Sequence, residues 1–274
     1  MGAYLSAPVT NKEFFEGSSP DVIYGGASMQ GWRRTMEDAH IATIELGGAP
    51  GAAMFGVFDG HGGSEVAKFC QVYMADELAK SRNYSEGKLQ ESLVDVFHRM
   101  DLLLQDDRYL RAALSAPEVP GNQPGEGGTN NAGALDKVRQ LLELHRARKE
   151  GERSRIMAAG GFLSNIGGVT RVNGNLNLSR AIGDLKYKTN SGLPANEQII
   201  TAEPDVKHVV LTGDDPFFLL ACDGVWDVMT NQQACDFVSQ RLQQNHDVKT
   251  ISGYELLIES SGMTITPVIL LRLL

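Results

Sequence analysis

Two apolar stretches of this 274-residue chain end in the same way, with an aspartate followed by a glycine. Met54–Phe58 runs into Asp59, and Phe217–Cys222 runs into Asp223. A buried strand holds a carboxylate at its end rigidly, and the following glycine lets a ligand approach closely. A single Asp-Gly pair is typical of an ordinary turn. Its repetition after two apolar runs favours a shared carboxylate site.

A third acidic pair, Glu37-Asp38, precedes the strand-like stretch Ile41–Leu46. Alone, such a pair also fits a charged strand end. Together with Asp59 and Asp223 it supplies oxygen donors with no cluster of Cys or His nearby. Hard cations such as Mg²⁺ and Mn²⁺ prefer oxygen ligands, whereas Zn²⁺ is usually bound by His or Cys. Two such ions, about 3.5–4 Å apart, share a bridging carboxylate and acidify a bound water, which then attacks a phosphate ester.

Phosphate-ester hydrolysis also needs a cation for the phosphate and an acid for the leaving group. Arg33 and Arg34 lie shortly before Glu37, and a planar guanidinium donates two hydrogen bonds to a phosphate. His61 follows Asp59-Gly60 and is flanked by glycines. So open a context favours a functional histidine over a buried structural one.

Four longer segments extend this pattern in chain order: Tyr24–His40, Val57–Gly63, Arg171–Asp184 and Leu220–Asp227. They resemble the characteristic motifs of the metal-dependent type 2C (PPM) protein serine/threonine phosphatases, in the order found in that family. The resemblance extends from residue 1 to about residue 243, and motifs of this length are highly specific.

The resemblance implies an α/β (α+β) fold in which two β-sheets form a sandwich flanked by helices, with part of one sheet missing in this chain. It implies dephosphorylation of phosphoserine and phosphothreonine in protein substrates. Carried over to this sequence, it makes Arg33 the phosphate-binding residue and His61 the general acid.

The resemblance also implies a site for two ions, Mg²⁺ or Mn²⁺. Asp59 corresponds to the bridging ligand and Asp223 to another ligand. Glu37 and the carbonyl of Gly60 correspond to ligands of the second ion, and Asp38 acts through bound water.

The sequence departs from the family pattern at two places, within 130–156 and 250–274. After Gly127–Thr129, where members continue into two long apolar strands, this chain passes almost at once into the helical stretch Val138–Glu152. Members usually end with an Asp-Asn-Met-Thr motif whose Asp binds metal, but Ser261-Gly262 stands in place of Asp-Asn. The last metal ligand is therefore expected to be absent.

These departures leave alternatives open. The first is a pseudophosphatase, or an incomplete sequence, that binds phosphoproteins without efficient turnover. The second is a two-metal nuclease or other phosphodiesterase. The formal net charge of −9 counts against the second, because binding nucleic acid requires clustered Lys and Arg.

Further features concern the compartment. Cys70, Cys222 and Cys235 have neither disulfide nor metal-ligand spacing, so we expect reduced core residues in a cytoplasmic protein. The opening Met1–Ser6 fits the pattern for N-myristoylation of Gly2. One acyl chain binds membranes only weakly, so the prediction is a cytoplasmic protein with weak membrane association; a nuclear location is also compatible with the sequence.

The expected organisation is an N-terminal segment over 1–20 and one phosphatase-like domain over 21–274. Helices are expected between Ser64 and Tyr109, and Asn231 is expected to cap a last helix that runs through Leu242. Strands are expected at Val22–Ala27, Ile41–Leu46, Ala52–Phe58, Val206–Leu211 and Phe217–Ala221. Thr264–Leu271 resembles a final strand, and Pro267 within it predicts an edge position.

Overall fold

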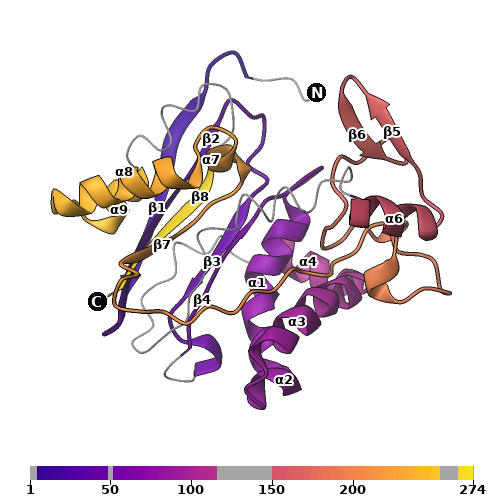
Figure 1. Cartoon of the computed structure of the whole chain (residues 1–274), viewed down its shortest axis with the longest axis horizontal. Coiled ribbons are helices and arrows are strands. Elements are labelled where there is room, and N and C mark those ends of the chain that lie inside the picture. The colour runs from indigo at the N-terminus through magenta and orange to yellow at the C-terminus, as the bar shows by residue number, and fades with distance from the viewer. Residues whose placement is uncertain (1–4, 49–51, 116–149, 254–264, 274) are drawn as a thin grey trace. The chain divides into compact units, whose positions relative to one another are not determined.

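The computed structural model describes residues 5–48, 52–115, 150–253 and 265–273, and Figure 1 shows them in colour. The chain divides into two compact units. Unit 1 comprises Met1–Asp76, Arg111–Asp136 and His208–Leu274, and unit 2 comprises Glu77–Leu110 and Lys137–Lys207. Within the described ranges, no helix is long and apolar enough to cross a membrane.

Unit 1 contains a four-stranded antiparallel sheet in the order β1-β2-β8-β7. Its strands are β1 (Val9–Ser18), β2 (Val22–Gly31), β8 (Ile265–Leu273) and β7 (Phe217–Leu220). All residues of β2 are buried or half-buried, as expected of an inner strand covered on both faces. Residues 9–18, within the N-terminal segment expected over 1–20, pair with β2 and belong to the same sheet.

The edge position predicted for the C-terminal strand is wrong, because β8 lies between β2 and β7. Pro267 is accommodated by an irregularity in the pairing: the register between β2 and β8 shifts between the pairs Ala27–Val268 and Met29–Ile265. A proline lacks the N–H that a regular ladder requires, and such a bulge removes that requirement.

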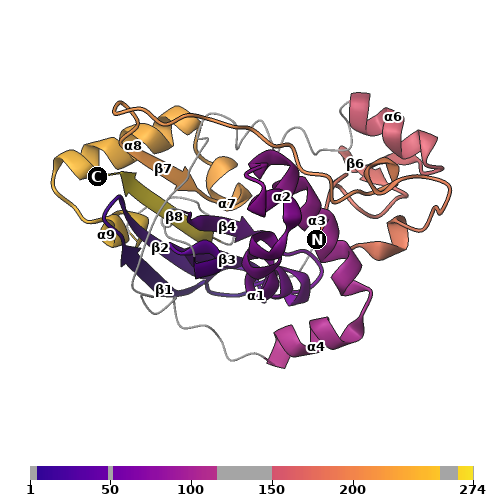
Figure 2. The same cartoon turned by 90° about the horizontal axis from the view of Figure 1, so that it is seen from below.

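A second sheet of unit 1 consists, in its described part, of β3 (Ala39–Thr43) and β4 (Met54–Phe58). It packs face to face on the first sheet through a shared apolar core. Buried side chains from both sheets meet in this core: Phe15, Val22, Tyr24, Ala42, Ile44 and Phe218, with the half-buried Phe55 and Val57 packed against them. The two sheets therefore form the predicted sandwich, which Figure 2 shows from below.

Helices cover both outer faces of this sandwich. α9 (Val248–Gly253) packs on β2, where a Cβ at Gly25 would lie 2.6 Å from the backbone nitrogen of Lys249. Glycine at this position is thus required for the close approach. On the other side, Gln71 of α1 (Glu65–Lys80) donates a 2.8 Å hydrogen bond to the carbonyl of His40 on β3. The α–β–β–α layering is confirmed within unit 1. Unit 1 also contains α7 (Asp223–Trp226) and α8 (Asn231–Gln243), which follow β7 in the chain.

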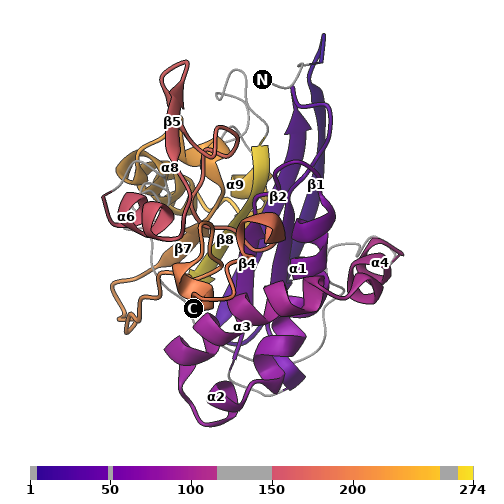
Figure 3. The same ribbon diagram turned by 90° about the vertical axis from the view of Figure 1, so that its right-hand side faces the viewer.

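Unit 2 packs helices against a short hairpin of β5 (Leu163–Ile166) and β6 (Val169–Val172), which extends beyond α6 (Glu150–Ala158) in Figure 3. Its core joins Ile156, Val172, Tyr187 and Ile200. The other helical elements of the described residues, from both units, are α2 (Arg82–Ser85), α3 (Leu89–Leu104), α4 (Asp107–Ser115) and the 3₁₀ turns Leu46–Gly48, Leu185–Tyr187 and Ala195–Glu197. The strand predicted over 206–211 is wrong: these residues have no regular secondary structure.

Candidate metal centre

The register of the second sheet brings two of the predicted carboxylates together. Ala39, the first residue of β3, pairs with Phe58, the last residue of β4. Asp38 and Asp59 are the next residues along each strand, so they emerge side by side at the same end of the hairpin. The backbone N–H of Gly60 donates a 3.1 Å hydrogen bond to Asp38 Oδ1 and ties the two loops together.

Gly60 is restricted to glycine by the neighbouring loop. A Cβ at this position would lie 2.0 Å from the carbonyl oxygen of Glu37, so the two backbones approach too closely for any side chain. Glu37 itself is half-buried, and its Oε1 accepts a 3.1 Å hydrogen bond from the hydroxyl of Thr35. The contact thus fixes the predicted ligands Glu37 and Gly60 next to each other.

The third carboxylate comes from the other sheet of unit 1. Asp223 is the first residue of the short helix α7, three residues after the end of β7. Cys222 caps this helix, because its Sγ accepts a 3.2 Å hydrogen bond from the N–H of Gly224. The buried Trp226 anchors it further, since its indole N–H donates to the carbonyl of Ala221 at 2.8 Å. The carboxyl groups of Asp223 and Asp59 are joined by a hydrogen bond.

Sequence analysis missed one participant in this cluster, the thiol of Cys222. It was expected to be a reduced core residue, and it is indeed buried and free. Its Sγ nevertheless lies, with one oxygen each of Asp38 and Asp59, in a group of atoms all within 4.8 Å of one another. The signal was its position directly before Asp223 at the end of a buried strand.

The electrostatics of the cluster oppose the charged state of its acids. Burial raises the pKa of Asp38 to about 7, with a further contribution from the charge of Asp223, although the Gly60 N–H and Arg33 act in the opposite direction. Burial of the carboxyl also raises the pKa of Asp59 to about 8, and the charges of Asp38 and Asp223 add to this. The Asp59 residue as a whole is exposed. Its carboxylate is nevertheless poorly hydrated because of the surrounding protein, and the neighbouring acids repel its negative charge.

The cluster fits a hard divalent cation. Asp38 Oδ2 is buried and has no hydrogen-bond partner among the described residues, and leaving such an oxygen unsatisfied is costly. A cation would satisfy this oxygen and offset the repulsion among the acids. The donor set is dominated by carboxylate oxygens, the ligands that Mg²⁺ and Mn²⁺ prefer.

Two other predicted site residues lie on loops beside the cluster. Arg33 is exposed on the β2–β3 loop, and its charge acts on both Asp38 and Asp59. Gln30 braces this loop by donating a 2.9 Å hydrogen bond to the carbonyl of Arg33. His61 is exposed on the loop that follows Asp59. Their proposed roles in binding phosphate and donating a proton stay predictions, as do the separate ligand roles of Glu37 and Gly60. Gly2 and Ser261-Gly262 fall outside the described residues.

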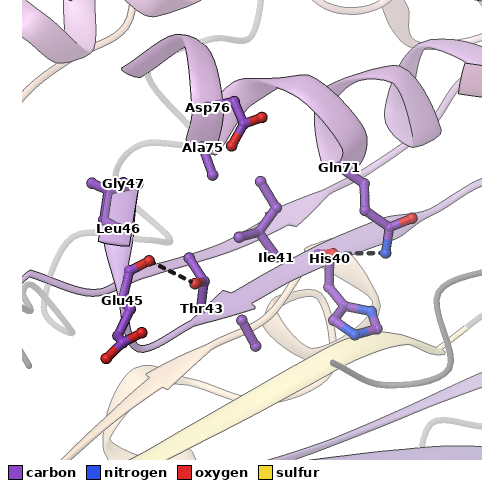
Figure 4. A pocket seen from close by; sticks show the side chains of 10 residues that line it. His40, Ile41, Thr43, Glu45, Leu46, Gly47, Gln71, Ala75 and Asp76 are labelled. Atoms are coloured by element: carbon purple, nitrogen blue, oxygen red, sulfur yellow. Dashed lines mark hydrogen bonds between the residues drawn. The ribbon is translucent and has the colours of Figure 1, made fainter. Parts of the chain in front are cut away.

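A separate cavity of about 200 Å³ lies beside β3 in unit 1. Figure 4 shows its walls, which come from β3, the 3₁₀ turn that follows and α1, with Gln71 reaching the carbonyl of His40. The predicted site residues do not line this cavity, so it is distinct from the carboxylate cluster.

Comparisons with known proteins agree with the cluster's chemistry. The family model described as "Protein phosphatase 2C" matches residues 22–117 and 128–256. "Probable protein phosphatase 2C 60" of Arabidopsis thaliana is 36% identical over 306 residues, covering 92% of this chain and 84% of that protein. "Protein phosphatase 2C 1" of Paramecium tetraurelia is 38% identical over 264 residues, covering 89% of this chain and 86% of that protein. In fold, the chain resembles a crystal structure of serine-threonine phosphatase 2C from Toxoplasma gondii, with a TM-score of 0.68, 18% identity and full coverage of both chains.

Proposed function

Because the chain belongs to the protein phosphatase 2C family of metal-dependent protein serine/threonine phosphatases, we propose that it hydrolyses phosphoserine and phosphothreonine in proteins with water activated by two Mg²⁺ or Mn²⁺ ions. The observation that carries this proposal is the cluster of Asp38, Asp59 and Asp223, in which one buried carboxylate oxygen has no partner in the part of the chain that the structure describes. A cluster so costly in free energy without a cation is expected where a cation is part of the function.

Different residues of the chain contribute different functions to hydrolysis. Asp59 and Asp223, whose carboxyl groups share a hydrogen bond in the metal-free protein, would give up the shared proton and hold the ions with Glu37 and the Gly60 carbonyl. Asp38 would orient bound water. Arg33 binds the substrate phosphate with its guanidinium. His61, on the same loop as Asp59, donates a proton to the leaving serine or threonine oxygen.

The alternative, a protein that binds phosphoproteins without turnover, rested on the departures from the family pattern. The curated relatives described above are named as phosphatases, which favours the enzyme over the binding protein. The expected loss of a ligand at Ser261-Gly262 then predicts weaker metal binding rather than a different activity.

The opening residues of the chain support a further proposal, myristoylation of Gly2 in a cytoplasmic protein. The modification would give weak, reversible membrane contact. It would place the enzyme near membrane-bound phosphoproteins without changing the carboxylate cluster.

The proposed function is tested by release of phosphate from a phosphothreonine peptide, with and without Mn²⁺. We expect metal-dependent hydrolysis that Asp59→Asn reduces at least about 100-fold, because a neutral amide would hold the ions more weakly than the carboxylate. Asp76→Asn is the matched control: it removes one exposed carboxylate of α1 in the same unit. Near wild-type turnover by Asp59→Asn, with an unchanged circular dichroism spectrum, would refute the assignment.

A further inference from the structure

The loop that carries Arg33 begins at the end of a strand that is paired on both sides. β2 lies between β1 and β8, and its last residue, Gly31, pairs with Val9 of β1. Gly31 has a φ of 63°, a left-handed conformation that residues with a side chain rarely adopt, and it turns the chain out of the strand. Residues 32–35 then form turns and bends. The loop therefore starts from a fixed point, and its further course depends on other contacts.

Gln30, the residue before this turn, holds the middle of the loop. Its side-chain Nε2 donates one hydrogen bond to the carbonyl of Arg33 at 2.9 Å and a second to the carbonyl of Arg34 at 3.2 Å. An amide nitrogen has two hydrogens, so each carbonyl can accept its own. The two bonds tie the loop back to the strand and restrain the backbone of both arginines.

A second contact holds the start of the same loop. The backbone N–H of Leu5 donates a 2.9 Å hydrogen bond to the carbonyl of Trp32. This bond lies just beyond the pairing of β1 with β2, so it extends the contact between the two strands into the loop. Together with the two bonds from Gln30, it restrains three consecutive carbonyls, those of residues 32–34.

The restrained loop places a cation beside the carboxylate cluster. Arg33 is exposed, yet its charge opposes the rise in the pKa of both Asp38 and Asp59. A guanidinium donates two parallel hydrogen bonds to a phosphate only from a suitable position, and a displacement of about an ångström already costs much of such an interaction. An exposed arginine has many rotamers, so the backbone that carries it must itself be well fixed.

We propose that Gln30, together with the N–H of Leu5, is a positioning residue that orients Arg33 towards the phosphate of the substrate. This inference rests on the proposed function, in which Arg33 binds that phosphate, and adds a residue that acts through the backbone of Arg33. The two side-chain hydrogen bonds of Gln30 go to the loop and not to the acids. Loss of these bonds should therefore weaken phosphate binding and leave metal binding unchanged.

The test compares the full chain with its Gln30→Met variant, which keeps a side chain of similar length and removes the donor. Gln232→Met is the matched control, because the exposed Gln232 also donates through Nε2, to Asp236 on α8. Calorimetry with inorganic phosphate, in excess Mg²⁺, measures phosphate binding without turnover. We expect Gln30→Met to raise the phosphate dissociation constant, and the KM for a phosphothreonine peptide, about tenfold. The kcat, the Mn²⁺ dissociation constant and all constants of Gln232→Met should stay within about twofold of the wild type.

A double-mutant cycle shows whether the effect passes through Arg33. Arg33→Ala should weaken phosphate binding by itself, and Gln30→Met should then add little, because no guanidinium remains to be oriented. The proposal would be overturned by a wild type that binds no phosphate or by unchanged phosphate binding in Gln30→Met. An equal loss with and without Arg33, or a parallel loss of Mn²⁺ binding, would overturn it as well.

Two further arms keep the outcome decisive. If circular dichroism shows that Gln30→Met is unfolded, Leu5→Pro takes its place, because proline lacks the N–H, and Leu5→Ala is the control that keeps it. The same rise in the phosphate dissociation constant is expected, and no rise would overturn the proposal. A wild type that binds phosphate but releases none from the peptide would refute the proposed function, and the calorimetric comparison would still decide the role of Gln30.

Discussion

Binding of Mn²⁺ should release protons, because two carboxyl groups of the cluster hold them at neutral pH. The pKa of Asp38 is raised to about 7 and that of Asp59 to about 8, in both cases chiefly by burial. A metal ligand such as Asp59 must be deprotonated, and nearby cations also favour the charged form of Asp38. At pH 7, metal binding therefore displaces a proton from Asp38 in about half of the molecules and from Asp59 in most of them. We expect between one and two protons released per protein at pH 7 and almost none at pH 9.

The same shifts make the stability of the metal-free protein depend on pH. Between about pH 4, the pKa of a carboxyl in the unfolded chain, and about pH 8, the folded protein binds more protons than the unfolded chain. Stability of the metal-free protein should therefore decrease as the pH rises through this range. Bound ions stabilise the charged carboxylates, so an excess of Mn²⁺ should remove most of the decrease.

Calorimetric titration measures the proton release directly. The enthalpy of Mn²⁺ binding is compared in buffers of different ionisation enthalpy, and the slope gives the number of protons released. Asp76→Asn, which removes an exposed acid on α1, should behave as the wild type. Proton release that is absent at pH 7, or equal at pH 7 and pH 9, would show that these carboxyls are ionised without the metal and would refute the electrostatic argument.

Three further predictions concern other parts of the chain. Ser261→Asp combined with Gly262→Asn should tighten Mn²⁺ binding about tenfold by calorimetry; strong two-ion binding by the unmodified chain would instead mean that another carboxylate already serves. Gly2→Ala should lower the membrane-bound fraction in cells and leave hydrolysis unchanged, and an intact mass showing unmodified Gly2 in the native host would contradict it. Burial lowers the pKa of His40 to about 4, so its proton uptake on unfolding destabilises the protein as the pH falls from about 6.5 to about 4, by up to about 3 kcal/mol. His40→Phe, which keeps a ring against Phe15, should reduce this acid sensitivity in urea denaturation at pH 5 and pH 7.5; an equal loss of stability in both proteins would contradict it.

The carboxylate cluster was predictable from sequence because each acid lies next to a strong local signal. Asp59 and Asp223 follow apolar strands, and Asp38 precedes one. When β3 and β4 pair as a hairpin, Ala39 lies opposite Phe58, so the adjoining residues Asp38 and Asp59 must be neighbours. The repeated Asp-Gly pattern indicated that Asp223 shares a site with Asp59, but no local pattern shows that Asp223 approaches from the other sheet.

Other elements escaped prediction for identifiable reasons. β1 has a single buried residue, Phe15, and carries charges at Lys12, Glu13 and Glu16, so its sequence lacks the alternation typical of a half-buried strand. Its pairing with β2 is decided by tertiary structure. The start of α8 was placed one residue too late, because Thr230 rather than Asn231 caps it, through a reciprocal pair of hydrogen bonds with Gln233. Thr230 and Asn231 both have side chains suitable for a cap, and only the hydrogen-bond geometry distinguishes them.

The C-terminal region helps to position the carboxylate cluster. β7 leads directly into Cys222 and Asp223, and among the described strands it pairs only with β8. β8 in turn joins β7 to β2, the strand that precedes the Arg33 loop. The position of Asp223 relative to Asp38 and Asp59 therefore depends on a strand that contributes no predicted ligand to the cluster. Because a carboxylate displaced by about an ångström already weakens catalysis greatly, the pairing of β8 in the centre of the sheet constrains the site as strongly as the identity of its acids.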